Sequence, residues 1–152
     1  MKPSRRRSRE LVLQGLYQWI YTGAGPAEVL KNLSEMETFK SADRDFLEEE
    51  LRGTIGAEKD LVARIEPFTG RKWKEVSPVE QAILLLAGWE LAHRPEIPYR
   101  VTINEAIELG KRFGATDGHK YVNGVLDRLA QETRPGEFGA SRPDQARKRR
   151  NA

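Results

Sequence analysis

The chain has 152 residues, a formal net charge of +3 and no cysteine, which excludes disulfides, thiolate zinc sites and cysteine nucleophiles. Its length suits one compact domain that buries its apolar surface without covalent staples. No apolar run is long enough to span a bilayer or to act as a secretory signal, so we predict a water-soluble, cytoplasmic protein.

The first predicted helix runs from Ser4 or Ser8 to Tyr21. Its apolar side chains recur at helical spacing, and a stretch rich in glycine and proline at residues 23–26 ends it. A second, shorter helix is expected over residues 27–37. No segment of the chain alternates between polar and apolar residues as a half-buried strand does, so the sequence predicts an all-α fold.

The third predicted helix begins at Ser41 or Asp43, both of which belong to residue types that cap helices. Gly53 and Gly56 weaken the middle of this helix because glycine has a low helix propensity. The apolar face continues past both glycines until Pro67 stops the helix, so we predict one helix up to Pro67.

A strong start signal opens the central helix. Ser77 occupies the cap position, Pro78 takes the first helical position, and Glu80 completes a capping box. The helix runs to about His93 and carries apolar side chains nearly all round. Such a helix is typically central in a core, so we expect it to lie among the others.

Two further helices complete the predicted core. Thr102 and Glu105 form a second capping box, which opens a helix that ends at Phe113. The last helix runs from His119 to about residue 132, with its apolar side chains on one face. All helices together number about six to seven.

These helices form an N-terminal group of three and a C-terminal group of three or four, packed on each other. We expect this single all-helical domain to cover residues 1–134. Prolines, glycines and charges follow Arg134, so residues 135–152 are expected to form a flexible basic C-terminal tail.

No motif of a common catalytic site is present. The sequence lacks a phosphate-binding glycine-rich loop and a His-Glu-x-x-His pattern, and none of its serines sits beside a histidine. Glu105 and Glu108 share a helix face and could form an acid/base pair, but we expect Glu105 to cap its helix and Glu108 to be solvated. His93 and His119 are expected on the surface. We therefore predict that the protein is not an enzyme and holds no metal or cofactor.

The basic N-terminus is the strongest local signal. Lys2, Arg5, Arg6, Arg7 and Arg9 all precede the first acidic residue. Four arginines within about one and a half helical turns repel one another, and the positive end of the helix dipole adds to the repulsion. A polyanion relieves both effects, and arginine both pairs with phosphate and stacks on bases. The alternative is a basic end that only aids solubility.

Aromatic side chains accompany these charges. Tyr17 lies about two helical turns after Arg9 and could stack an unpaired base, or could be partly buried among apolar neighbours. The loop at Asp117 leads into a helix N-terminus, whose free N–H groups favour anions. Lys120 adds charge there, and Tyr121 adds a stacking face. Because no exposed recognition helix appears, these features favour single-stranded RNA over duplex DNA.

Several segments together match a known pattern. Residues 98–109 read PYRVTINEAIEL, residues 111–114 read KRFG, and residues 119–127 read HKYVNGVLD. The RRRSRE of residues 5–10 and the segment at residues 79–91 add looser matches. Between Lys2 and Arg134 the chain closely resembles the NusB family of bacterial transcription antitermination factors.

The resemblance implies a fold of two three-helix halves and a role in transcription antitermination. It implies binding to the boxA element of ribosomal RNA transcripts in a heterodimer with NusE, a small-subunit ribosomal protein. Further Nus factors and RNA polymerase would join this complex, so that transcription passes terminators. Carried over by position, the RNA-contacting set comprises Lys2, Arg5, Arg6, Arg7, Arg9, Tyr17, Lys120 and Tyr121, with Asp117 at its edge.

The resemblance also places Glu80 on the NusE-facing side. Two positions depart from the family pattern: Tyr121 replaces a phenylalanine and keeps a stacking ring, whereas Ser8 replaces an alanine, which we expect to matter little. Similar domains are fused to ribosomal RNA cytosine methyltransferases, but this chain has no cysteine for their covalent chemistry. A protein-interaction module in ribosome assembly and a hydrolase using Glu105 and Glu108 stay open as alternatives, as does a homodimer without NusE.

Overall fold

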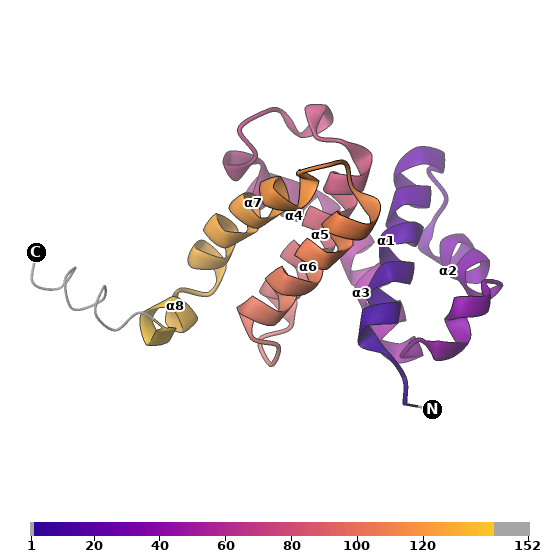
Figure 1. The fold of residues 1–152 in the computed structure, drawn as a ribbon. Coiled ribbons are helices and arrows are strands. Elements are labelled where there is room, and N and C mark those ends of the chain that lie inside the picture. Colours follow the sequence, from indigo (N-terminus) through magenta and orange to yellow (C-terminus); the bar gives the residue numbers. More distant parts are fainter. Residues whose placement is uncertain (1, 142–152) are drawn as a thin grey trace, which may run out of the picture.

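The computed structural model describes residues 2–141, and these residues form an all-helical bundle (Figure 1). Within this range we find no β-strand, which confirms the all-α prediction. Three short 3-10 turns connect helices. The eight α-helices are α1 (Arg5–Thr22), α2 (Pro26–Ser34), α3 (Arg44–Gly56), α4 (Glu58–Ile65), α5 (Pro78–His93), α6 (Tyr99–Phe113), α7 (Gly118–Thr133) and α8 (Pro135–Ser141).

Helix α5 is the centre of the bundle, as its sequence predicts. It contacts α1, α3, α4, α6 and α7, and its residues 82–88 are all buried. The hydroxyl of Ser77 accepts a hydrogen bond from the Glu80 N–H at 3.3 Å, so the predicted cap is formed. None of the helices at residues 2–141 combines the length and the hydropathy that a bilayer crossing requires.

The start of α1 is tied to the start of α3. Ser4 caps α1, because its hydroxyl accepts from the Arg7 N–H at 3.0 Å. Ser8 is fully buried, and its hydroxyl accepts a 2.8 Å hydrogen bond from the N–H of Asp43, the residue that caps α3. A serine at position 8 therefore does more than the sequence suggested, since an alanine could not accept this bond.

The third predicted helix is two helices in the structure. Helix α3 ends at Gly56, Ala57 separates the two helices, and α4 packs its buried Leu61 and Ile65 into the core. The prediction of a single helix is wrong because the apolar pattern continues through the break, whereas the backbone does not. The turn follows Gly56, where helix propensity is lowest.

The predicted capping box at Thr102 is also wrong. Helix α6 begins three residues earlier, directly after Pro98. Thr102 is buried, and its hydroxyl donates to Glu90 at 3.1 Å. Glu105 lies on the second turn of the helix and pairs with arginines of α1 rather than with a backbone N–H.

Helix α8 lies beyond the domain boundary expected at Arg134. Phe138 is buried and stacks on Tyr99 with ring centroids 4.3 Å apart, so α8 contacts the rest of the bundle through this side chain. The Arg134 guanidinium donates to the carbonyl of Leu91 in α5 and to the carbonyls of Arg94 and Ile97 after α5, which fixes this junction. Residues 142–152 of the predicted tail lie outside the described residues.

We predict that Gly53→Ala destabilises the fold. A Cβ at Gly53 would lie 2.3 Å from the Trp89 ring, and relieving such overpacking typically costs about 1–3 kcal/mol. Gly56→Ala in the same helix is the control, because a Cβ there meets nothing within 4 Å. The unfolding free energy of this variant should equal that of the unaltered protein or exceed it slightly. Urea denaturation measures both, and equal stability of the two variants would contradict the packing argument.

Candidate nucleic-acid interface

One stripe of α1 carries two of the predicted RNA-contacting side chains, Arg6 and Tyr17. Arg6, Glu10, Leu13 and Tyr17 recur at the spacing that places them above one another on a helix. Arg6 and Glu10 line a cleft between α1 and α6, whereas Leu13 and Tyr17 line a second cleft farther along α1. The stripe therefore runs from a charged end to an aromatic end.

The predicted N-terminal cations differ in their surroundings. Lys2 and Arg5 are exposed, and the Arg5 guanidinium lies 4.6 Å from the ring centroid of Phe46. The Arg6 side chain is 66% exposed, although Glu105 accepts two of its hydrogen bonds at 3.1 and 2.7 Å. Arg7 is half-buried and donates to Glu10 at 2.9 Å. Arg5, Arg6 and Arg7 are thus within reach of a ligand.

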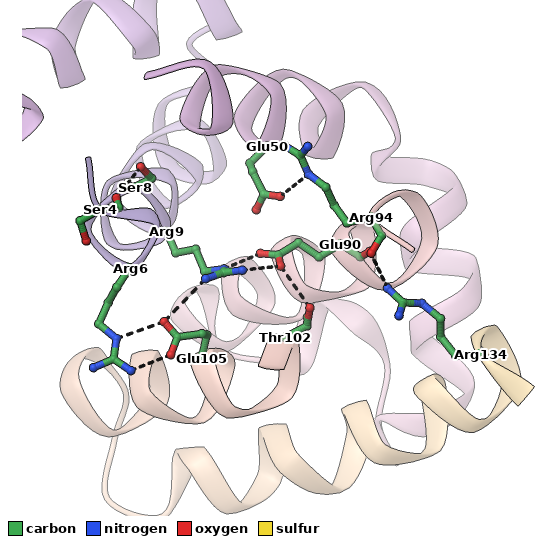
Figure 2. A network of polar contacts seen from close by, with 10 residues as sticks. All are labelled: Ser4, Arg6, Ser8, Arg9, Glu50, Glu90, Arg94, Thr102, Glu105 and Arg134. Atoms are coloured by element: carbon green, nitrogen blue, oxygen red, sulfur yellow. Dashed lines mark hydrogen bonds and ion pairs between the residues drawn. The ribbon is translucent and has the colours of Figure 1, made fainter. Parts of the chain in front are cut away.

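Arg9 is placed differently from its neighbours, and Figure 2 shows why. Only 5% of Arg9 is exposed, and its guanidinium makes two hydrogen bonds to the buried Glu90, at 2.8 and 2.9 Å. Its third nitrogen lies 3.6 Å from Glu105. The Arg9 guanidinium is thus buried and paired with Glu90, which argues against the RNA-contacting role expected for it.

The pair formed by Arg9 and Glu90 belongs to a larger buried network. Burial, the largest single effect, raises the pKa of Glu90, but the hydrogen bonds from Arg9, Glu50 and Thr102 and the positive charge of Arg9 together outweigh burial and hold this pKa below its ordinary value. Glu50 of α3 lies beside Glu90 and accepts from Arg94 at 3.2 Å. Burial, and then the negative charge of Glu90, raise the pKa of Glu50 far above its ordinary value. We infer that Glu50 is protonated at neutral pH.

The aromatic cleft, defined by Leu13, Gln14, Tyr17, Val79 and Phe113, joins α1 to the start of α5 and the end of α6. Tyr17 is partly exposed and contacts Tyr21 one turn on, with ring centroids 4.7 Å apart. The side-chain oxygen of Gln14 is buried without a hydrogen-bond partner among the described residues. A flat apolar group with an N–H donor fits these walls, and a nucleobase has both properties.

The remaining predicted residues gather at the start of α7. Asp117 adopts a left-handed backbone conformation, with φ of 69°, and lies 3.3 Å from Lys120. The Tyr121 hydroxyl donates to the Thr69 carbonyl at 2.8 Å, and the Arg71 guanidinium covers one face of its ring at 4.6 Å. Tyr121 is consequently half-buried, and Arg71 adds a cation that the sequence analysis did not single out.

Neighbouring side chains of α5 and α6 lie between the α7 start and the stripe on α1. Val79 lines the aromatic cleft, and the next residue, Glu80, reaches α7, since a Cβ on Gly118 would lie 3.3 Å from its carboxylate oxygen. Phe113 lines the same cleft, and the adjacent Arg112 lines the cleft beside Arg6. The stripe on α1 and the α7 start thus form one strip, with Glu80 between them. Arg5 lies apart from this strip, because its guanidinium covers Phe46 of α3 and lies 3.9 Å from Asp43.

The geometry does not support the alternative that Glu105 and Glu108 form a catalytic carboxylate pair. Glu105 pairs with Arg6, whereas Glu108 lies 3.7 Å from Lys111 and is largely exposed. His93 stacks on Trp89, one turn earlier in α5. Among residues 2–141 we find no group of three or more histidine or carboxylate side chains arranged to hold a metal ion.

Comparison with known proteins gives a consistent result. The family model described as the NusB family matches residues 6–131. The chain is 52% identical to the transcription antitermination protein NusB of Dechloromonas aromatica over 91% of this chain and 85% of that protein. It is 50% identical to NusB of Aromatoleum aromaticum over 93% of this chain and 97% of the relative.

Solved structures agree with the fold. T. maritima NusB superimposes with a TM-score of 0.80 at 30% identity, covering 91% of this chain and 99% of that one. A second match, with a TM-score of 0.78 at 22% identity, covers 84% of this chain and 96% of the other. It comes from a crystal structure of the antitermination factors NusB and NusE in complex with dsRNA.

We predict that Arg9→Ala strongly destabilises the fold. The change leaves the Glu90 carboxylate buried without its main counterion, and breaking a buried pair in this way costs about 3–5 kcal/mol. Arg52→Ala is the control, because Arg52 pairs with Glu48 on the surface and its loss should cost less than about 1 kcal/mol. Urea denaturation gives both values. A small loss for Arg9→Ala would show that the pair contributes little.

We also predict that Glu50→Gln changes the pH dependence of stability. Above the ordinary carboxyl pKa of 4.5, the folded protein keeps a proton on Glu50 that the unfolded chain releases, so stability falls as pH rises. Glutamine resembles the protonated acid and removes this loss. The free energy of unfolding of the variant, measured relative to that of the unaltered protein, should therefore rise between about pH 6 and about pH 9, by at most about 1.4 kcal/mol per pH unit.

The control is Glu49→Gln, because Glu49 is exposed and pairs with the same Arg94 at 3.0 Å. Its unfolding free energy should run parallel to that of the unaltered protein over the same pH range. Parallel curves for Glu50→Gln as well would show that Glu50 carries no extra proton in the folded state.

Proposed function

The chain belongs to the NusB family of transcription antitermination factors, a non-enzymatic family, and from this premise we propose that it binds boxA RNA of ribosomal RNA transcripts together with NusE. In this role it helps RNA polymerase to read through terminators. The observation that carries the proposal is the stripe on α1, where the exposed cation Arg6 and the base-sized aromatic cleft at Tyr17 lie on one helix face.

The composition of the strip suits single-stranded RNA. Guanidinium groups bind backbone phosphates, and exposed aromatic rings stack on unpaired bases, each for about 1–3 kcal/mol. The proposed contacts from α1 and α7 are mostly exposed or half-buried, which leaves their polar groups within reach. We assign RNA contact to Lys2, Arg5, Arg6, Arg7, Tyr17, Lys120 and Tyr121, with Asp117 at the edge.

Protein partners follow from the same premise. The related structure that contains NusB, NusE and dsRNA supports a heterodimer with NusE. Glu80 lies beside the α7 start, so a partner that touches Glu80 would border the RNA strip directly. Further Nus factors and RNA polymerase are proposed to assemble on this heterodimer in the cytoplasm. We propose that a single all-helical domain makes these contacts.

We predict that Tyr17→Leu weakens the binding of boxA RNA about tenfold, because leucine keeps an apolar contact but removes the stacking surface. Tyr21→Leu is the matched control: Tyr21 is more exposed and lies one turn beyond the aromatic cleft, so its effect should be much smaller. Fluorescence anisotropy with labelled boxA RNA and the NusE complex measures both affinities.

A scrambled RNA of equal length separates sequence recognition from general attraction. The unaltered complex should bind boxA more tightly than the scrambled RNA at every salt concentration, although both affinities fall as salt rises. Equal affinities would contradict the proposal and favour a protein-interaction module that meets ribosomal RNA without sequence preference.

A further inference from the structure

The cleft between α1 and α6 contains two arginines that each lean on a carboxylate of the opposite helix. We propose that this cleft is a binding site for one backbone phosphate of RNA, held by Arg6 and Arg112, and that Glu105 and Glu10 occupy these arginines when RNA is absent. The inference rests on the proposed RNA-binding function and extends it, because Arg112 and the two glutamates lie outside the contacts assigned above.

The two pairs mirror each other across the helices. Arg6 of α1 donates to Glu105 of α6, and Arg112 of α6 donates to Glu10 of α1. All four side chains line one cleft with a volume of about 120 Å³. Because a phosphodiester group presents two charged oxygens to two guanidinium groups, a cleft bordered by two arginines suits it.

Exposure distinguishes the cations from the carboxylates. The Arg6 and Arg112 side chains are 66% and 60% exposed, whereas those of Glu105 and Glu10 are 14% and 9% exposed. The guanidinium groups therefore form the outer layer, and the carboxylates lie beneath them. An incoming phosphate meets the arginines first and competes with the carboxylates for them. Glu105 binds Arg6 through two hydrogen bonds (Figure 2), whereas Glu10 binds Arg112 through one.

Each carboxylate also contacts a second arginine. Glu105 lies 3.6 Å from the buried Arg9, and Glu10 accepts from Arg7 at 2.9 Å. When a phosphate draws Arg6 and Arg112 away, neither glutamate loses its only counterion. The exchange thus avoids the large cost of a partly buried unpaired charge.

The site also links two parts of the strip. Arg112 precedes Phe113, which lines the aromatic cleft with Tyr17. A phosphate between Arg6 and Arg112 would therefore lie next to a base stacked at Tyr17, as successive groups of one RNA strand require. Arg112 thus adds a cation between the basic N-terminus and the aromatic cleft.

The first test replaces the competing carboxylate. Glu105→Gln keeps the shape of the side chain but frees Arg6 from its charge, so boxA RNA should bind the NusE complex about fivefold more tightly. Glu108→Gln is the matched control, since Glu108 lines the same cleft on the same helix and carries the same charge but pairs with Lys111. Its gain should be clearly smaller. Circular dichroism and urea denaturation show that both variants are folded.

Two outcomes of this test overturn the inference. The first is an equal gain for Glu105→Gln and Glu108→Gln, which would show a general effect of net charge. The second is a gain that persists in the double variant Arg6→Gln, Glu105→Gln, because the freed group would then not be Arg6.

The second test locates the phosphate. Arg112→Gln should weaken boxA binding about fivefold. It should also reduce the slope of log affinity against log salt concentration by about one, the loss of about one phosphate contact. A series of boxA RNAs, each with one neutral methylphosphonate linkage, should reveal one linkage whose neutralisation weakens binding to the unaltered complex but not to the Arg112→Gln complex. If every linkage affects both complexes alike, Arg112 contacts no phosphate and the inference fails while the proposed function stands. If the unaltered complex does not bind boxA RNA, the proposed function fails with it.

Discussion

The buried ion pair of Arg9 and Glu90 is the constraint on which the rest of this structure depends. It joins α1 to the central helix α5, and the Thr102 hydroxyl of α6 donates to the same carboxylate, so three helices meet at one charged group. Removing two charges from water is costly, and a buried pair rarely adds net stability over an apolar contact. Its value lies in orientation, since a guanidinium and a carboxylate that bond twice permit only one rotation of α1 against α5.

That rotation decides which side chains of α1 meet solvent. With Arg9 directed at Glu90, the neighbouring stripe of Arg6, Glu10 and Tyr17 must face the groove beside α6 and the start of α5. A turn of α1 by a single residue, about 100°, would bury a different set of side chains and leave Glu90 without a counterion. The interior pair therefore positions the surface that we propose binds RNA, although it touches no RNA itself.

The sequence predicts features that short-range signals determine and misses those that depend on distant partners. The cap at Ser77 and the apolar character of α5 are local, and both predictions hold. The buried state of Arg9 had a local signal that the arginine-rich context concealed, because Arg9 lies three residues before Val12 and seven before Leu16 on the core-facing side. Glu105, by contrast, binds Arg6 across 99 positions of the chain, and no periodicity within α6 indicates such a partner.

Glu105 of α6 lies between a buried and an exposed arginine of α1. On one side it meets Arg9, which Glu90 holds in the core regardless of what happens outside, and on the other it meets the exposed Arg6. Because the inner contact persists when the outer one is broken, the pairing state of Arg6 can change without disturbing the bundle. Stability and the strength of the surface charge are thus set by different members of one network: Arg9 and Glu90 determine whether α1 is in place, and Glu105 determines how much of the positive charge at its start is available to a ligand.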